Sequence, residues 1–205
     1  MAIARTFFAQ VELDDLAKQG IAGGEESGSN MASKSLEENV RDLAARRDIE
    51  RAVLDYIRGQ DRLEPETQRR AFHDDAHVDC GTFAGDPDGY VAYAQHFLSL
   101  CKGSHHMLGQ MDIWIDGDVG HGEIYLIAWH RIVEDETEKD LIVGARYIDR
   151  YECRDGVWKI AKRREIMDWT RTDPPSDSFI AQYPQLHLGQ RGAQDFSHHR
   201  TWPTT

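Results

Sequence analysis

The chain has 205 residues, which is enough for one domain with modest extensions and too few for two well-packed enzyme domains. Apolar residues make up 40% of it and charged residues 29%, a globular composition, and no run approaches the roughly 18 apolar residues that cross a bilayer. The formal net charge of −12 would repel phosphate backbones and anionic lipid surfaces. We therefore expect neither nucleic acid nor a membrane as a partner.

The cysteines and the N-terminal pattern bear on the location of the protein. Cys80, Cys101 and Cys153 are odd in number and widely spaced, which predicts neither a disulfide framework nor a zinc ribbon. The apolar start is soon interrupted by acidic residues from Glu12 onward, unlike a secretory signal. We expect reduced thiols and a cytoplasmic location.

The composition also changes along the chain. Residues 21–30 are rich in Gly, Ser and Glu, which is typical of a linker. We predict an N-terminal extension and linker over residues 1–31, one domain over residues 32–173, and an irregular tail over residues 174–205. The extension is either an arm that docks on a neighbouring subunit or a segment of little consequence.

The first half of the predicted domain is helical. A Ser-x-x-Glu capping pattern at Ser35 predicts a long helix that ends near residues 59–62. The apolar stripe of this helix changes phase after Asp48, which is consistent with a bend or a restart there. Pro65 predicts the start of a second, shorter helix that continues to Phe72.

The second half reads as β-structure. Residues 77–83 alternate as in a strand, and Asp86 with the proline after it predicts the start of a third helix. Four extended segments then follow, over residues 106–115, 122–133, 141–153 and 157–168, with hairpin turns at 116–118 and 154–156. This order predicts an α+β fold in which a curved antiparallel sheet wraps around the helices and leaves a pocket.

The end of the long helix carries the first candidate residues. Tyr56 and Asp61 are five positions apart, so they lie roughly 140° apart around a regular helix. Asp61 reaches the side of Tyr56 only if the chain turns inward at Gly59. The alternative is that Tyr56 belongs to the core and that Asp61 is a solvated carboxylate.

The strands carry further candidates. His105 and His106 begin the first long strand, and adjacent strand residues point to opposite faces, so at most one of them enters a pocket. His130 lies on an apolar strand face, where it must find a hydrogen-bond partner or remain neutral. Each of these could instead be structural, and the charge run around Arg163 is typical of a solvated surface. No spacing predicts a metal site.

Four segments together carry a resemblance: LDYIRGQDR, FHDDAHVD, HHMLGQMDIWIDGD and YECRDGVWKIAKRR. In this order, over about residues 36–171, the chain resembles the nuclear transport factor 2-like superfamily. The most similar branch is the SnoaL-like group, which includes scytalone dehydratase, hexachlorocyclohexane dehydrochlorinase and bile acid 7α-dehydratase. The resemblance implies a cone-like α+β fold with an internal pocket and a homodimer or homotrimer. The fold also hosts isomerases, cyclases and noncatalytic binding modules.

The resemblance assigns roles to the candidates. It implies that Asp61 and His106 form a catalytic pair in which Asp61 orients His106 and His106 removes a proton from carbon. Tyr56 and His130 would hydrogen-bond a departing hydroxyl or a carbonyl. Arg163 would stabilise developing negative charge. No cofactor and no metal is expected for this chemistry.

The expected function is therefore a cofactor-independent lyase, with dehydratase-like elimination from a hydrophobic aromatic or polycyclic alcohol in aromatic compound catabolism. The expected substrate-binding residues are Phe97, Met107, Trp129 and Met167. Three alternatives stay open: a carbon–carbon lyase that releases formaldehyde from an aryl-propane diol, a ketosteroid-isomerase-like isomerase, and a noncatalytic binding or assembly subunit. The aromatic and aliphatic residues of the tail also predict that it is ordered in a homo-oligomer.

Overall fold

The computed structural model describes residues 34–199 and 202. The contacts divide the chain into two compact units, Met1–Glu37 and Glu38–Thr205. The predicted extension and linker over residues 1–31 lie outside the described residues. None of the helices in the described ranges combines the length and apolarity that a bilayer span needs.

Helix α2 (Leu36–Asp61) is one unbroken helix, so the restart considered at Asp48 does not occur. The phase change has another physical reason. The second stripe, represented by Ile49 and Tyr56, is buried in the core, whereas residues of the first stripe such as Leu36 are exposed. Two stripes with different surroundings therefore share one helix.

The end of α2 is shaped by a close helix contact. Gly59 is an internal residue of the helix and does not end it, because α2 continues to Asp61. A Cβ at Gly59 would overlap with the backbone of Gln68 in the short helix α3 (Pro65–Arg70). The glycine thus lets α3 pack directly on α2. The helix does not end at this glycine, which was the condition considered for an inward Asp61, and Asp61 is nevertheless buried at the last position of the helix.

Helix α4 (Pro87–Leu100) begins as predicted. The side chain of Asp86 accepts a hydrogen bond from the backbone nitrogen of Gly89 at 2.9 Å, an N-cap. The preceding strand differs from the prediction, because β1 (Phe72–Asp79) starts at Phe72 and ends four residues earlier than expected. A short strand, β2 (Ala84–Gly85), pairs with it.

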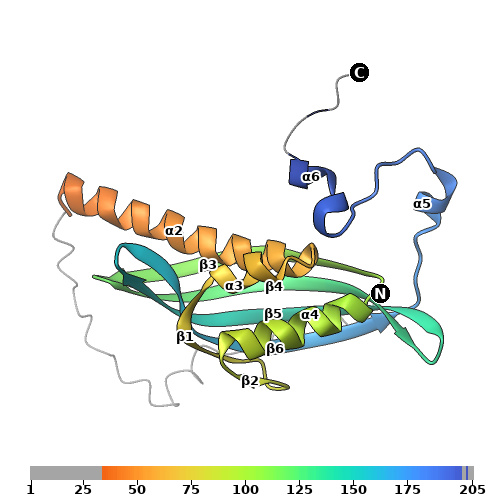
Figure 1. Cartoon of the computed structure of the whole chain (residues 1–205), viewed down its shortest axis with the longest axis horizontal. Helices are drawn as coiled ribbons and strands as arrows, with labels where there is room; N and C mark the ends of the chain where they lie inside the picture. The colour runs from red at the N-terminus through yellow and green to blue at the C-terminus, as the bar shows by residue number, and fades with distance from the viewer. Residues whose placement is uncertain (1–33, 200–201, 203–205) are drawn as a thin grey trace, which may run out of the picture. The chain divides into compact units, whose positions relative to one another are not determined.

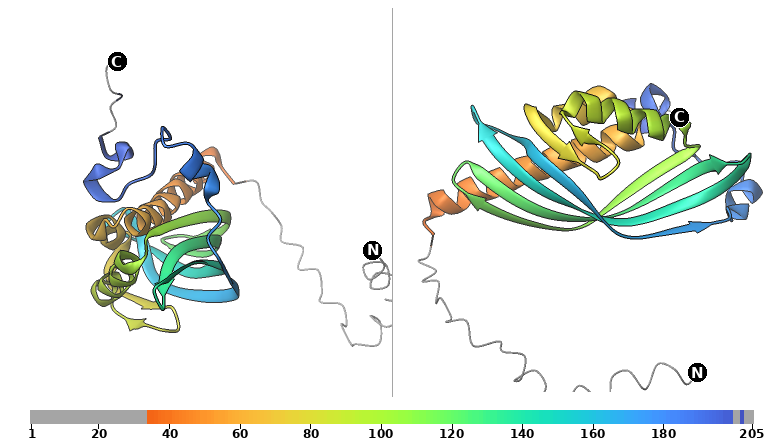
Figure 2. Two further views of the ribbon diagram at one scale, coloured as in Figure 1. Left: turned by 90° about the vertical axis from the view of Figure 1, so that its right-hand side faces the viewer. Right: turned by 90° about the horizontal axis from the view of Figure 1, so that it is seen from below.

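Four long strands build most of the sheet: β3 (Gly103–Asp116), β4 (Val119–Glu134), β5 (Thr137–Arg154) and β6 (Val157–Asp173). They form the predicted antiparallel meander, and the sheet order is β2-β1-β6-β5-β4-β3. The exception is β1, which runs parallel to β6. The sheet is curved and open, and α2, α3 and α4 lie on its concave side (Figures 1 and 2). The predicted α+β fold is confirmed.

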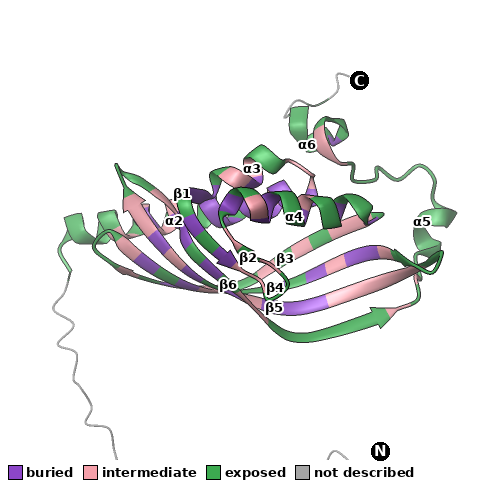
Figure 3. Cartoon of the chain, turned by 60° about the horizontal axis from the view of Figure 1, so that its bottom comes forward, coloured by how far each residue is buried: buried purple, intermediate pink, exposed green. Residues whose placement is uncertain are grey.

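Alternation along the strands separates an inner from an outer face. Figure 3 shows buried and exposed segments following one another along β4, β5 and β6. Inner residues such as Ile124 and Tyr147 pack against Tyr56 of α2 and Phe72 of β1 in one hydrophobic core. The aromatic rings meet edge to face, with 5.5 Å between the ring centres of Tyr56 and Tyr147.

The described part of the tail after β6 contains three short helical turns, α5 (Ser178–Gln182), η2 (Gly192–Gln194) and α6 (Phe196–His199). Part of it is ordered against its own domain. The guanidinium of Arg191 donates hydrogen bonds to the carbonyl oxygens of Leu98, at 3.0 Å, and Cys101, at 2.9 Å. These carbonyls close the C-terminal end of α4, so one tail residue caps the helix that flanks the pocket.

Candidate active site

Asp61 and His106 form a hydrogen-bonded pair at the end of α2 and the start of β3. Nδ1 of His106 lies 2.7 Å from Oδ1 of Asp61, and the backbone nitrogen of His106 donates to Oδ2 at 3.0 Å. Both carboxylate oxygens are therefore used, which fixes the imidazole ring in one orientation. The side chain of Asp61 is 11% exposed, and that of His106 is 5% exposed. Nε2 of His106 is the nitrogen that can act on a substrate.

The strand alternation decides between the two adjacent histidines. His105 is exposed on the outer face of β3, whereas His106 points inward and lines a cavity. The β3–β4 register places Ser104 opposite His130, two residues from His106, so both inward-facing histidines come to the same end of the sheet. Their ring centres are 5.1 Å apart, edge to face.

His130 is the second histidine of the cavity and is buried. Burial, together with the charges of His106 and Arg191, lowers the pKa of His130 to about 4. At neutral pH the ring is therefore uncharged. Its Nδ1 has no hydrogen-bond partner among the described residues. Such a neutral ring can donate a hydrogen bond to an oxygen atom of a ligand or accept one from a ligand hydroxyl, but it is a poor cationic acid.

The cavity has a volume of about 260 Å³ and lies between α4 and the concave face of the sheet. Its wall is mainly apolar. Phe97 and Met167, both expected as substrate contacts, line it together with Gln60, Cys80, Thr82, Tyr90, Tyr93, Ala94, Leu98, His106, Ala128, His130, Leu141, Val143, Tyr147 and Glu165. The ring of Phe97 packs against His130, with 5.5 Å between the ring centres.

Tyr56 lies behind the cavity wall. Its ring is completely buried, and its hydroxyl is 2.5 Å from the hydroxyl of Tyr90, which lines the cavity. Burial raises the pKa of both phenols. The structure therefore gives Tyr56 an indirect position, in which it acts on the cavity through Tyr90.

Arg163 is placed differently from the sequence expectation. Its guanidinium donates two hydrogen bonds to Asp149, at 2.8 and 2.6 Å, and both side chains are fully buried. It also stacks on Tyr56 and Tyr147, with its central carbon 4.1 and 4.0 Å from the two ring centres. Arg163 does not line the cavity. It supports the aromatic wall from behind, and a direct contact with substrate is not available to it.

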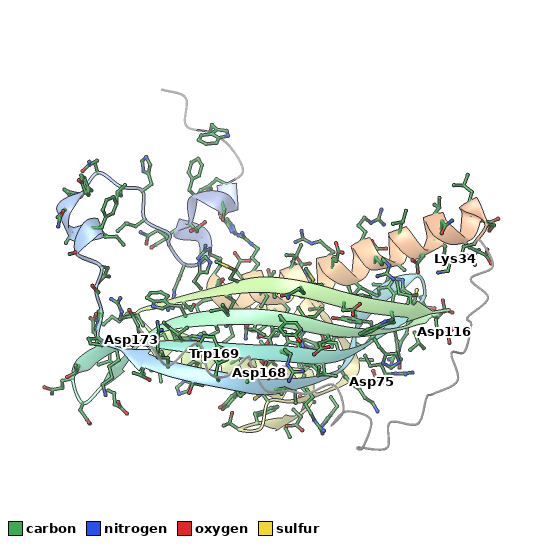
Figure 4. All side chains as sticks on the ribbon, turned by 180° about the vertical axis from the view of Figure 1, so that it is seen from behind. Lys34, Asp75, Asp116, Asp168, Trp169 and Asp173 are labelled. Carbon is green, nitrogen blue, oxygen red and sulfur yellow. The ribbon has the colours of Figure 1, made fainter. Side chains whose placement is uncertain are left out.

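The structure corrects the expectation that Met107 and Trp129 contact the substrate. Both lie on the outer face of the sheet, where Met107 lines a separate groove and Trp129 packs with Arg131, 5.3 Å from its ring centre. The physical reason is alternation, because each is the chain neighbour of an inward-facing histidine. Figure 4 shows the sheet from behind, with Asp168 and Trp169 of the same groove labelled. Neither residue can contact a substrate in the cavity.

Several polar residues of the cavity were not expected from the sequence, most importantly Glu165 and Gln60. Glu165 is two positions from Arg163 on β6, so strand alternation places both residues on the inner face. Burial raises the pKa of its carboxyl, and the charges of Arg163 and His106 oppose this shift. Gln60 precedes Asp61, and its buried Oε1 has no partner among the described residues. Gln60 lies within the quoted segment LDYIRGQDR, but the resemblance gave it no role.

A metal site needs several ligands close together. Among residues 34–199 and 202, no three His, Cys, Asp or Glu side chains gather in an arrangement that could hold a metal ion. The carboxylate and histidine side chains at the cavity instead form one close pair, Asp61 with His106, and two separate groups, His130 and Glu165. This arrangement is suited to proton transfer.

A comparison with models of known protein families shows to which family the chain belongs. The model of the SnoaL-like domain matches residues 41–164, more than half of the chain. The chain belongs to the SnoaL-like family. The resemblance seen in the sequence is confirmed, and the matched segment of this SnoaL-like protein contains Asp61, His106 and His130.

Solved structures show the same nuclear transport factor 2-like fold. Hexachlorocyclohexane dehydrochlorinase type 3 from Novosphingobium barchaimii is 22% identical, with a TM-score of 0.60 over 65% of this chain and 93% of that chain. A scytalone dehydratase-like protein from Novosphingobium aromaticivorans is 23% identical, with a TM-score of 0.58 over 67% of this chain and 96% of that chain. The search of curated proteins finds no match. At identities this low, the structural similarity shows the fold of this SnoaL-like protein.

Proposed function

We propose that this SnoaL-like protein is a cofactor-independent lyase that eliminates water from a hydrophobic ring alcohol. One observation carries the proposal: a buried Asp61–His106 pair whose free ring nitrogen belongs to the wall of an apolar cavity. A carboxylate that holds one imidazole nitrogen makes the other a positioned general base. The dehydrochlorinase and the scytalone dehydratase-like protein, two structural neighbours, are named for elimination reactions.

In the proposed reaction, Nε2 of His106 removes a proton from a carbon atom of the substrate. The electron pair of that C–H bond forms a double bond, and the C–O bond to the leaving hydroxyl breaks. Tyr90, held by Tyr56, and the neutral His130 are placed to hydrogen-bond oxygen atoms of the substrate. The dyad is 5–11% exposed, so the reaction runs away from bulk water, where these hydrogen bonds are stronger.

The cavity also limits the substrate. Its volume of about 260 Å³ lies just below the range of about 300–1,000 Å³ that is typical of drug-sized ligands. One or two fused rings fit this volume better than a four-ring skeleton does. The unpartnered Oε1 of Gln60 requires a hydrogen-bond donor, such as a hydroxyl, on the ligand. We therefore favour aromatic alcohols with one or two rings, as in the breakdown of aromatic compounds.

The test is a screen of one- and two-ring alcohols with mass detection of the products. The proposal expects loss of water with the wild type and a loss of activity of about a hundredfold to ten-thousandfold in His106→Ala. His105→Ala, one residue away on the outer face, is the matched control and should keep its activity. Products of unchanged mass would show an isomerase, and loss of formaldehyde would show the carbon–carbon lyase. Ligand binding without turnover would show a binding subunit.

We also propose that the protein forms a homodimer or homotrimer through the outer face of the sheet. Met107, Tyr125, Ile127 and Trp169 are exposed there around a groove of about 410 Å³. A contiguous apolar surface of this kind is typical of an interface. The three cysteines are free thiols in the structure, and on this basis we propose a cytoplasmic location.

A further inference from the structure

The proposed elimination needs a proton donor as well as a base. When the C–O bond breaks, the oxygen leaves as hydroxide unless it receives a proton, and a free anion is strongly disfavoured in an apolar cavity. The donor must belong to the cavity wall, because it has to reach the leaving oxygen. The resemblance implied that Tyr56 and His130 hydrogen-bond this hydroxyl or a carbonyl and that Arg163 stabilises negative charge, but Tyr56 and Arg163 lie behind the cavity wall.

Most polar groups near the cavity are poor acids. Burial lowers the pKa of His130 to about 4, so its cation is scarce at neutral pH. Burial raises the pKa of Tyr90 and Tyr147 well above the ordinary value of a phenol. Arg163 is hydrogen-bonded to Asp149 behind the wall and does not reach the cavity.

Glu165 lies in the cavity wall and, in contrast to these groups, can serve as an acid. It lines the same cavity as His106, and the β5–β6 register places it directly opposite Tyr147 on the inner face. Its pKa is affected by burial and by the charges of Arg163 and His106, with no hydrogen bond among these influences. Burial raises this pKa and so favours the neutral carboxyl, which carries an O–H donor. The structure thus places the base, His106, and a carboxyl group whose pKa is raised in one cavity.

We propose that Glu165 is the general acid that protonates the leaving hydroxyl, a role that rests on the proposed lyase function. Nε2 of His106 takes the proton from carbon, and the C–H electron pair becomes the second bond of the alkene. The C–O electron pair stays on oxygen, which takes the carboxyl proton of Glu165 and leaves as water. His106 then releases its proton to solvent and Glu165 regains one, so no oxidant or reductant is needed.

The proposal gives a pH dependence with a defined sign. Glu165 must be protonated, so turnover of an alcohol falls as the pH rises through the pKa of Glu165, and Glu165→Gln lacks this dependence. The titratable groups that face Glu165 or share its cavity are Tyr56, Cys80, Tyr90, Tyr93, His106, His130, Tyr147 and Arg163, and each would be tested as a source of the same pH dependence. The pKa values of Arg163 and of the buried phenols Tyr56, Tyr90 and Tyr147 are raised. Their titration therefore does not change turnover at acidic or neutral pH.

The test compares two leaving groups on one two-ring skeleton, 3-hydroxy-1-indanone and 3-chloro-1-indanone, both of which form indenone. Hydroxide needs a proton to leave, whereas chloride does not. Glu165→Gln should lower kcat on the alcohol by about a hundredfold or more, with a loss on the chloride that is at least about tenfold smaller. Glu165→Asp keeps a carboxyl and should be intermediate on the alcohol. The spontaneous elimination of each probe is measured without enzyme and subtracted.

The controls separate the two levels of the proposal. Glu66→Gln makes the same chemical change on the exposed surface of α3 and should leave both reactions unchanged. Equal losses of Glu165→Gln on both probes, or no loss on either, would overturn the role of Glu165 while the lyase function stands. If the wild type turns over neither probe, the lyase function fails with it. Thermal melting and binding of 1-indanone establish that each variant is folded.

Discussion

Two buried polar atoms on the cavity wall have no partner among the described residues, Nδ1 of His130 and Oε1 of Gln60. An unsatisfied buried group costs about 1–3 kcal/mol, and a hydrogen bond to a bound substrate would offset that cost. Both atoms share a cavity with His106. They are therefore the groups that a substrate oxygen would satisfy on binding, next to the base that acts on it.

The low pKa of His130 predicts how stability depends on pH. The folded protein holds this ring neutral down to about pH 4, whereas the unfolded chain takes up a proton below the ordinary pKa of 6.5. The free energy of unfolding therefore falls as the pH falls through this window, by up to about 3 kcal/mol for this group. Urea unfolding of His130→Gln, which cannot ionise, should show a smaller loss than the wild type over the same window.

The exposed His105 supplies the control for this measurement. His105→Gln should lose as much stability as the wild type between about pH 6.5 and about pH 4, because the side chain of His105 is exposed on the outer face and the buried His130 is unchanged. The same loss in the wild type and in His130→Gln would show that His130 titrates normally in the folded protein.

At the same scale, the sequence could predict the dyad but not the whole wall. Asp61 and His106 were found because the helix end and the strand start carry a family pattern, and the strand period allows only one of the two adjacent histidines to face inward. The same period should have excluded Met107 and Trp129. Their hydrophobicity outweighed the alternation in the prediction, and the outer face proved to be apolar as well.

At the scale of elements, local signals predicted well and long-range pairing did not. The cap at Asp86 and the hairpin turns are set by neighbouring residues, and the structure confirms them. The parallel pairing of β1 with β6 joins segments about 85 positions apart, for example Asp79 with Arg164. No local period encodes it, so the start of β1 was misplaced.

The tail is the element whose position depends on single contacts. The carboxylate of Asp195 accepts hydrogen bonds from the backbone of Gln190 and from Ser197, and these lower the pKa of Asp195 to about 2. In η2, the backbone nitrogen of Gly192 donates a hydrogen bond to the carbonyl oxygen of Arg62 at 2.6 Å. Asp195→Ala should release this segment and increase the rate of trypsin cleavage after Arg191 about tenfold or more.

An exposed tail residue gives the comparison for that experiment. Gln185→Ala changes the same tail at an exposed position and should leave the cleavage rate as in the wild type. Equal cleavage rates for Asp195→Ala and Gln185→Ala would mean that the hydrogen bonds of Asp195 do not hold the tail on its domain.

At the scale of the whole molecule, the outer sheet face predicts self-association. Met107 and Ile127 are exposed in the outer groove, and Asp168, which also lines it, is paired with Arg146, which in turn pairs with Glu123. An apolar centre with a charged edge is the usual anatomy of a protein interface. Light scattering should show a dimer or trimer for the wild type and a monomer for the double variant Met107→Glu, Ile127→Glu.

The matched control introduces a carboxylate at an exposed apolar residue elsewhere. Val157→Glu lies at the β5–β6 hairpin, outside the groove, and should keep the oligomer. A monomeric wild type, or an unchanged oligomer in the double variant, would contradict the assignment of this face.

The most direct test of the account is a double-mutant cycle on the dyad, with turnover of 3-hydroxy-1-indanone as the measurement. Asp61 acts only through His106 here, so Asp61→Asn with His106→Ala should be little slower than His106→Ala alone. Each single variant should lose about a hundredfold or more, and His105→Ala should lose little. Losses that multiply independently, or a larger loss at His105 than at His106, would contradict the assignment of His106 as the base.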